Sequence, residues 1–314
     1  MGSVNAIPDR DVVVLGAGAT PALSLGYSLP FSVYQHLMHL VRQPLQQDVD
    51  VTTAFAVAVA RIRAVYLPIG PFNALEFGAA GAATSADLGA GLRARAAVIA
   101  DAIGTATAEA EGAYRAERWP EHGPMLVEAL ERAHALLAPH KDELLTRLAS
   151  ALGVEAQTES YEVHLVPVCH EPTGGYSHPT VVSVAVFQGL HLVEAILHEL
   201  AHVMMQAGRE EPGALAAALG AACRRRKRPA RLALELLHVF VFHATGEIVR
   251  ERYGAEHVPH AQARGLYARA SALLRAEVSE HVIGEIWAQR QEGPEVIAER
   301  LLDRVGGHGR TGAG

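Results

Sequence analysis

Hydrophobic residues recur every three or four positions along most of the first half of the chain, which is the period of an amphipathic helix. Prolines interrupt this pattern and separate the predicted helices from one another. The predicted helices cover residues 31–40, 51–66, 88–114 and 125–137. Residues 1–153 are therefore expected to form a mainly helical region.

The pattern changes after residue 153. Residues 161–167 alternate between apolar and polar side chains, and residues 180–187 are rich in valine, so both segments are predicted as strands. The Gly- and Pro-containing segment between them, 171–179, is predicted as a loop. Helical periodicity returns at 190–207 and continues from 212 to about 304. We therefore expect an α+β, predominantly helical fold, whose second region, 154–314, has a small antiparallel or mixed sheet beside the helix at 190–207.

This helix contains the sequence His198-Glu199-Leu-Ala-His202, which is an HExxH motif. Histidines four positions apart lie on one helical face, so both imidazoles can reach one Zn²⁺ at roughly 2.0–2.1 Å. Glu199 lies beside the first histidine, where its carboxylate can take a proton from a water at the metal. The motif predicts His198 and His202 as ligands and Glu199 as the catalytic general base. The alternative, an ordinary helix, would leave charged residues on an apolar segment at a cost in free energy.

Around this motif the chain resembles the zincin superfamily of metallopeptidases. The resemblance covers residues 161–253 and does not extend to residues 1–153. It implies a zincin-like region in which one of the two strands, 161–167 or 180–187, flanks a substrate cleft beside the HExxH helix. It also implies the same roles for the two histidines and the glutamate of the motif.

A zincin needs a third protein ligand for its zinc. Met205 and Gly208 stand where the metzincin pattern has glycine and histidine, so the likeness is to the gluzincin branch, in which a later helix supplies the ligand. The apolar segment 231–250 is the helix in range. Its candidate side chains are Glu235, His238, His243 and Glu247.

Helix geometry separates these candidates. His238 and Glu247 lie roughly 13 Å apart along the axis, so they cannot bind the same ion. The resemblance places the third ligand in the early turns, and we predict His238, with Glu235 and Glu247 as alternatives. His243 lies more than one turn beyond His238 and is predicted to contact a developing oxyanion as a second catalytic residue. For each candidate the alternative is a hydrogen-bonded polar side chain in the core.

Composition excludes several other classes of protein. The 314 residues have 50% hydrophobic and 19% charged side chains, which excludes a disordered chain. No apolar run approaches the roughly 20 residues of a membrane span, and the N-terminus lacks a secretory signal pattern, so a soluble, cytoplasmic protein without a membrane partner is expected. Cys169 and Cys223 are too few for a disulfide framework. A net charge of -7 gives no general attraction to nucleic acid.

Three weaker signals are interpreted as structural. Gly16 and Gly18 resemble the start of a dinucleotide-binding fingerprint, but Pro21 stands where its third glycine belongs. The basic run 224–231 is expected to be a solvated loop between helices. The histidines at positions 36 and 39 are expected to be partly exposed helix residues.

These observations lead to the hypothesis of a zinc-dependent metallohydrolase, a metallopeptidase that acts on a peptide or small amide substrate. Two alternatives remain open at this point. One is a non-catalytic helical binding module with a structural or vestigial metal site. The other is a non-hydrolytic metalloenzyme, because two histidines and a third ligand can also bind iron.

Overall fold

In the computed structural model, the described residues are 7–16, 18–42, 53–66, 90–154, 160–169, 174–178, 181–206, 213–274 and 278–306. They form two compact units, each built from separate stretches of the chain. The first unit comprises Met1–Leu15, Leu23–Ala135 and Tyr161–Val186, and the second comprises Gly16–Ala22, Leu136–Ser160 and Phe187–Gly314. The boundary predicted between residues 153 and 154 lies inside the second unit.

A five-stranded mixed sheet forms the centre of the first unit. Its strands are β1 (Arg10–Leu15), β2 (Leu23–Ser28), β3 (Tyr161–Val166), β4 (Gly175–His178) and β5 (Val181–Ala185), in the order β1-β2-β3-β5-β4. The central pairs β2–β3 and β3–β5 are parallel, whereas the edge pairs β1–β2 and β4–β5 are antiparallel. The buried apolar side chains of β2, β3 and β5 occupy mainly alternate positions, and the paired residues Leu25, Val163 and Val182 place them on one face of the sheet.

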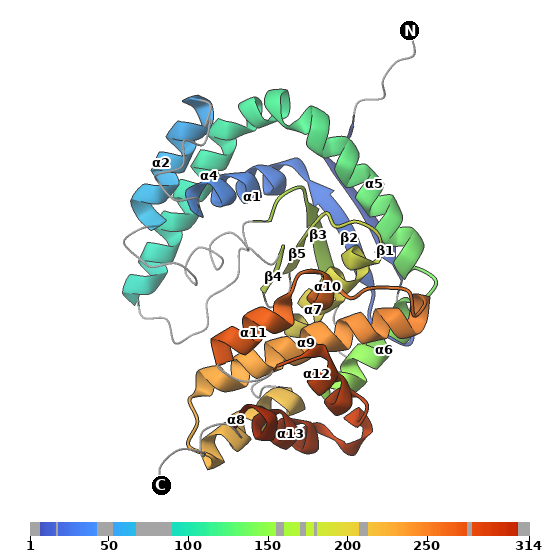
Figure 1. The fold of residues 1–314 in the computed structure, drawn as a ribbon. Helices are drawn as coiled ribbons and strands as arrows, with labels where there is room; N and C mark the ends of the chain where they lie inside the picture. Colours follow the sequence, from blue (N-terminus) through green and yellow to red (C-terminus); the bar gives the residue numbers. More distant parts are fainter. Residues whose placement is uncertain are drawn as a thin grey trace. The chain divides into compact units, whose positions relative to one another are not determined.

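Four helices complete the first unit, and they are the helices that the hydrophobic period predicts (Figure 1). Helix α1 packs against both α2 and α4, which also pack against each other. The four helices are α1 (Leu29–Arg42), α2 (Thr53–Tyr66), α4 (Ala90–Glu117) and α5 (Trp119–Leu137).

The second unit is helical, and its longest helix, α9 (Ala230–Tyr253), packs against most of the others. Its neighbours include α7 (Leu190–Gln206), which is the predicted HExxH helix, and α8 (Ala214–Arg225). Figure 1 shows α9 crossing this unit with the shorter helices around it. The remaining elements are α6 (Lys141–Leu152), α10 (His260–Ala263), α11 (Leu266–Leu274), α12 (Glu280–Trp287), η1 (Arg290–Glu292) and α13 (Pro294–Gly306).

The structure confirms the α+β, predominantly helical class, and it corrects three local predictions. The sheet is not confined to residues 154–314, because β1 and β2 come from the N-terminal region and pair with β3 through β2. The segment 171–179 is not only a loop, because residues 175–178 pair with β5 as strand β4. Pairing partners far along the chain decide this, and the local turn signals do not contain them. His36 is not partly exposed: only 8% of it is accessible, because α1 is covered by α2 and α4.

Helix α9 is long and apolar enough to span a membrane by composition alone. However, 61% of its most apolar window is buried inside the second unit, as in the core helix of a soluble protein. Both cysteines are buried as well, at 7% and 1% exposure.

Candidate metal centre

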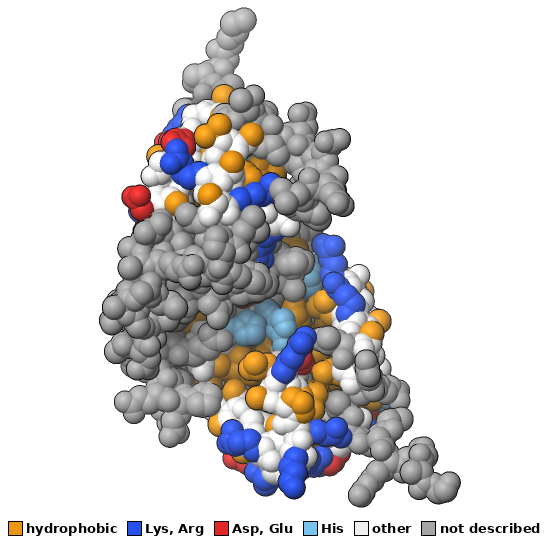
Figure 2. Space-filling model, turned by 90° about the vertical axis from the view of Figure 1, so that its left-hand side faces the viewer, with side chains coloured by type: hydrophobic (Ala, Val, Ile, Leu, Met, Phe, Trp, Pro, Cys, Tyr) orange, Lys and Arg blue, Asp and Glu red, His pale blue; other side chains and the backbone are white. Residues whose placement is uncertain are grey.

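Three histidine side chains from two helices of the second unit converge on one point. His198 and His202 lie one turn apart on α7, and His238 lies on α9, which packs against α7. The Nε2 atom of His198 is 3.0 Å from Nε2 of His238 and 3.1 Å from Nε2 of His202. We call these three residues the histidine triad. Figure 2 shows histidine side chains gathered among hydrophobic ones on one face of the protein.

Hydrogen bonding alone does not account for this geometry. An imidazole nitrogen carries either one proton or one lone pair, so Nε2 of His198 can satisfy only one of its two close neighbours by a hydrogen bond. A cation between the three nitrogens would instead accept a lone pair from each. Tetrahedral zinc with bonds of 2.0–2.1 Å holds its ligand atoms about 3.3 Å apart, close to the observed separations.

Electrostatics favour the neutral imidazoles that a metal requires. Burial lowers the pKa of His198 well below its ordinary value, and the neighbouring rings of His202 and His238 lower it further. Burial, followed by the charge of His238, lowers the pKa of His202 to about 3. The pKa of His238 is also lowered, again chiefly by burial. All three rings therefore keep their lone pairs at neutral pH.

The ring of Phe242 packs against two histidines of the triad. Phe242 lies one turn beyond His238 on α9, and its ring stacks on that of His198 with centroids 3.7 Å apart and an angle of 25° between the planes. The same phenyl ring also contacts His238, at 4.8 Å between centroids. It therefore restricts the orientation of two of the three imidazoles. The Nδ1 atom of His198 is buried and has no hydrogen-bond partner among the described residues.

Glu199 follows His198 directly on α7, and only 5% of the residue is exposed. Burying a charged carboxylate to this extent costs free energy, whereas a carboxylate on the surface keeps its contact with water. Its place next to the first triad histidine is the one that the sequence predicts for the general base.

The two alternative third ligands point to other partners. Glu235 forms an ion pair with Arg231 at 3.2 Å, and Glu247 forms one with Arg250 at 3.1 Å. Neither belongs to the group of converging ligand atoms at the triad. The structure thus brings His238 to the HExxH pair and leaves the two glutamates elsewhere on α9.

His243 is not brought to the triad. Its Nδ1 lies 2.7 Å from the hydroxyl of Tyr267 on α11, and its ring also contacts Trp287 on α12. Only 2% of His243 is exposed. Five residues along a helix correspond to about 140° of rotation, which explains why His238 and His243 face different neighbours. His243 therefore occupies the place of a hydrogen-bonded core residue, the alternative to its predicted catalytic role.

A second polar cluster, which was not predicted from the sequence, lies on the same side of α7. His191 and Glu194 precede His198 at helical spacing, so these residues share one face of the helix. Glu194 contacts Nε2 of His257 and accepts a hydrogen bond from the backbone N–H of His260 at 2.9 Å. The spacing of 191, 194, 198 and 202 is the signal that identifies this polar stripe on an otherwise apolar helix.

A protein carboxylate binds the backbone that directly follows Gly18. Asp142 accepts hydrogen bonds from the backbone N–H groups of Ala19 and Thr20 at 3.1 and 3.2 Å. Its side chain also accepts a hydrogen bond from the Thr20 hydroxyl at 2.6 Å. Ala19 and Thr20 precede strand β2, so these N–H groups do not form the helix N-terminus at which a dinucleotide-binding fold holds phosphate. Their engagement by Asp142 agrees with the structural interpretation of this motif.

Acidic side chains partly neutralise the basic run 224–231. Arg225 and Arg226 both pair with Glu299 on α13, and Arg226 also pairs with Asp303 at 2.6 Å. Figure 2 shows Lys and Arg side chains at the lower end of the protein, with acidic side chains among them. Only residues 226–229 form the connection between helices, because Arg224 and Arg225 end α8 and Arg231 lies in the first turn of α9.

No family model, curated protein or solved structure matches this chain.

Proposed function

We propose that this protein is a zinc-dependent metallohydrolase, specifically a metallopeptidase that cleaves peptide or amide bonds. The observation that carries the proposal is the convergence of three neutral imidazoles, two from an HExxH motif and one from a separate helix. Three histidines that leave one position open form a donor set of catalytic zinc sites. Non-haem iron sites more commonly include a carboxylate in the ligand set, which favours zinc over iron here.

The residues of the chain have distinct roles in this proposal. His198, His202 and His238 would hold the ion, and Phe242 would keep the ring of His198 oriented. When bound, zinc acts as a Lewis acid that polarises a carbonyl group and makes water a better nucleophile at neutral pH. Glu199 would accept the proton that the attacking water releases. General-base catalysis of this kind contributes about 10²–10⁴-fold to a rate.

The test separates the chemical role of Glu199 from metal binding. The full chain is loaded with Zn²⁺, and the hydrolysis of fluorescein-labelled casein and of a quenched peptide library is measured at neutral pH. Glu199→Gln is expected to keep its zinc at the triad and to lose hydrolysis by about 100-fold or more. His198→Ala is expected to lose both the zinc and the activity.

His281→Ala is the matched control for removing a histidine, because His281 lies exposed on α12 with 82% of its side chain accessible. This variant should retain zinc and activity. Wild-type protein that holds zinc at the triad but cleaves no peptide would refute the peptidase assignment. Full activity in both Glu199→Gln and His198→Ala would refute the metallohydrolase assignment altogether.

A further inference from the structure

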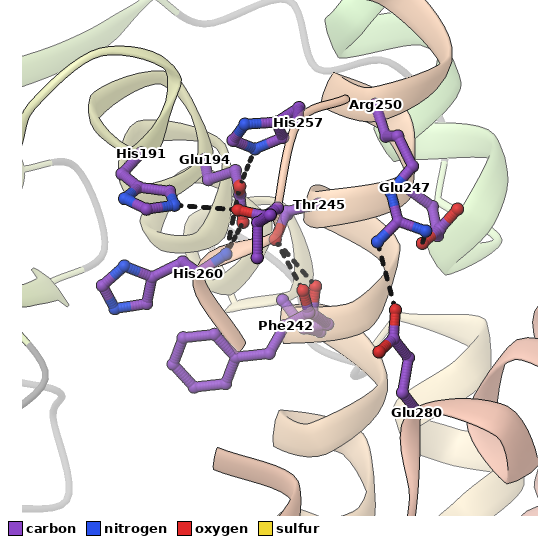
Figure 3. A network of polar contacts seen from close by, with 11 residues as sticks. His191, Glu194, Phe242, Thr245, Glu247, Arg250, His257, His260 and Glu280 are labelled. Carbon is purple, nitrogen blue, oxygen red and sulfur yellow. Dashed lines mark hydrogen bonds and ion pairs between the residues drawn. The ribbon is translucent and has the colours of Figure 1, made fainter. Parts of the chain in front are cut away.

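A second group of side chains suited to a metal lies in the same unit as the histidine triad. His191 and Glu194 come from the first turns of α7, and His257 comes from the segment between α9 and α10. Each offers one ligand atom, and these three atoms lie within 4.8 Å of one another. Figure 3 shows the three side chains converging from the two segments.

The carboxylate of this group is deeply buried. Only 2% of Glu194 is exposed, its Oε1 contacts Nε2 of His257, and its Oε2 accepts the backbone N–H of His260. A negative charge on a carboxylate buried to this extent is costly unless a positive charge lies beside it.

The surrounding network does not supply that charge in full. Arg250 forms ion pairs with Glu247 and with Glu280, both at 3.1 Å (Figure 3). One guanidinium is thus shared between two other carboxylates. A divalent cation at Glu194 would balance the remaining negative charge, because its own charge exceeds that of the carboxylate.

The backbone also holds the ring of His191. The carbonyl oxygen of Val258 is 2.9 Å from Nε2 of His191 and can accept a hydrogen bond from it. Two imidazoles and a carboxylate combine nitrogen and oxygen donors. A set of two histidines and one glutamate is among the established ligand sets of zinc.

We propose that His191, Glu194 and His257 form a second divalent-cation site of the zinc type. An ion at this site would join the first turns of α7 to the segment that leads from α9 into α10. The site is separate from the triad, since the ligand positions of the two sites are on average about 11 Å apart along α7. Two ions that act on one substrate group lie about 3.5–4 Å apart, so the two sites do not form a two-metal catalytic centre.

Counting ions per chain tests this proposal without any measurement of activity. The full chain is stripped with a chelator, dialysed, reloaded with Zn²⁺ and analysed for bound zinc. Wild type should hold two ions, whereas Glu194→Gln and His198→Ala should each hold one, and the double variant none. Glu194→Gln preserves side-chain shape and an acceptor for the His260 N–H, and circular dichroism checks that it folds.

Two further variants complete the design. Glu247→Gln is the matched control for a partly buried glutamate on a neighbouring helix, and it should keep two ions. His191→Ala is a second probe, because this partly exposed side chain can be removed with less disturbance of the core than Glu194. It should also hold one ion. Chelation of zinc should lower the midpoint of thermal unfolding of His198→Ala, which holds an ion at the second site. The same treatment should not change the midpoint of the double variant, which holds no ion.

The outcomes distinguish the two sites from each other. One ion in wild type that is lost in His198→Ala and kept in Glu194→Gln overturns the second site and leaves the triad intact. One ion that is lost only in Glu194→Gln supports the second site and overturns zinc binding at the triad. Two ions that survive both Glu194→Gln and His191→Ala overturn the second site, and so does an absence of bound zinc in wild type.

Discussion

The Nε2 atoms of His198 and His238 lie 3.0 Å apart, although forty positions separate the two residues and they belong to different helices. The site therefore depends on how α7 and α9 pack, and not on the HExxH motif alone. The stack of Phe242 on His198 connects the same two helices at the same point. A metal that binds here would add a further link between them.

The third ligand can be tested by comparing two residues on the same face of α9. His238→Ala should weaken zinc binding at the triad by at least about 100-fold, since losing a ligand costs more than losing an outer partner. Glu235→Ala should weaken zinc binding much less than His238→Ala, because Glu235 pairs with Arg231 and reaches His238 only through its charge. Competition with a chelating dye measures both affinities. A larger loss in Glu235→Ala than in His238→Ala would contradict the assignment.

Tyr267→Phe tests whether His243 has a structural role. The variant removes the hydroxyl that lies 2.7 Å from Nδ1 of His243, in a place that excludes water. Leaving this nitrogen unpaired should lower the free energy of unfolding by about 1–3 kcal/mol. The zinc content and the kcat should stay as in wild type. Chemical denaturation and steady-state kinetics give the two readouts, and a lower kcat at unchanged stability would instead support the predicted catalytic role.

Two helical glycines should respond to alanine with opposite signs. A Cβ atom at Gly246 on α9 would lie 2.6 Å from Cβ of Pro259, so the added methyl group has no room. A Cβ at Gly284 on α12 would meet its nearest neighbour, the ring of His243, at 3.7 Å, which is an ordinary contact.

Gly246→Ala is expected to lower the free energy of unfolding by about 1–2 kcal/mol, because the strain of overpacking exceeds the gain in helix propensity. Gly284→Ala is expected to raise it by up to about 1 kcal/mol. Urea denaturation of both variants measures the difference. Equal effects of the two substitutions would mean that Pro259 does not pack against α9 as the structure has it.

His36 should make the first unit sensitive to acid. Burial, followed by the positive charge of Arg118 and the rings of His122 and His39, lowers the pKa of His36 to about 4. Between pH 6.5 and pH 4 the unfolded chain binds a proton at this position that the folded chain does not. The free energy of unfolding should therefore fall by up to about 3 kcal/mol as the pH drops through this range.

His36→Leu removes this dependence. Neither ring nitrogen of His36 has a hydrogen-bond partner among the described residues. Replacing the ring by leucine should therefore leave no described polar group without a partner. The variant should show a shallower loss of stability between pH 6.5 and pH 4. His134→Leu, made at an exposed position on α5, controls for the removal of one histidine. Parallel slopes for wild type and His36→Leu would contradict the prediction.

The predictions from the sequence were most successful where the local pattern decides the structure. The period of apolar residues identified α1, α2, α4, α5 and α7, the alternation at 161–167 identified β3, and the valine-rich run at 180–187 identified β5. These elements follow from side chains that are neighbours along the chain. The strands β2 and β4 were missed because each depends on pairing with its neighbouring strands, which its own residues do not specify.

For the candidate site, the HExxH motif alone specified two histidines and a glutamate on one helix, since the spacing of helical positions fixes which side chains share a face. Which later residue joins them was decided by the packing of α9 on α7, which puts His238 beside His198 and turns His243 toward Tyr267. The same packing gathers His191, Glu194 and His257. Periodicity contains no information about which helices meet or at what rotation. Side chains from distant segments therefore came together only through the tertiary structure.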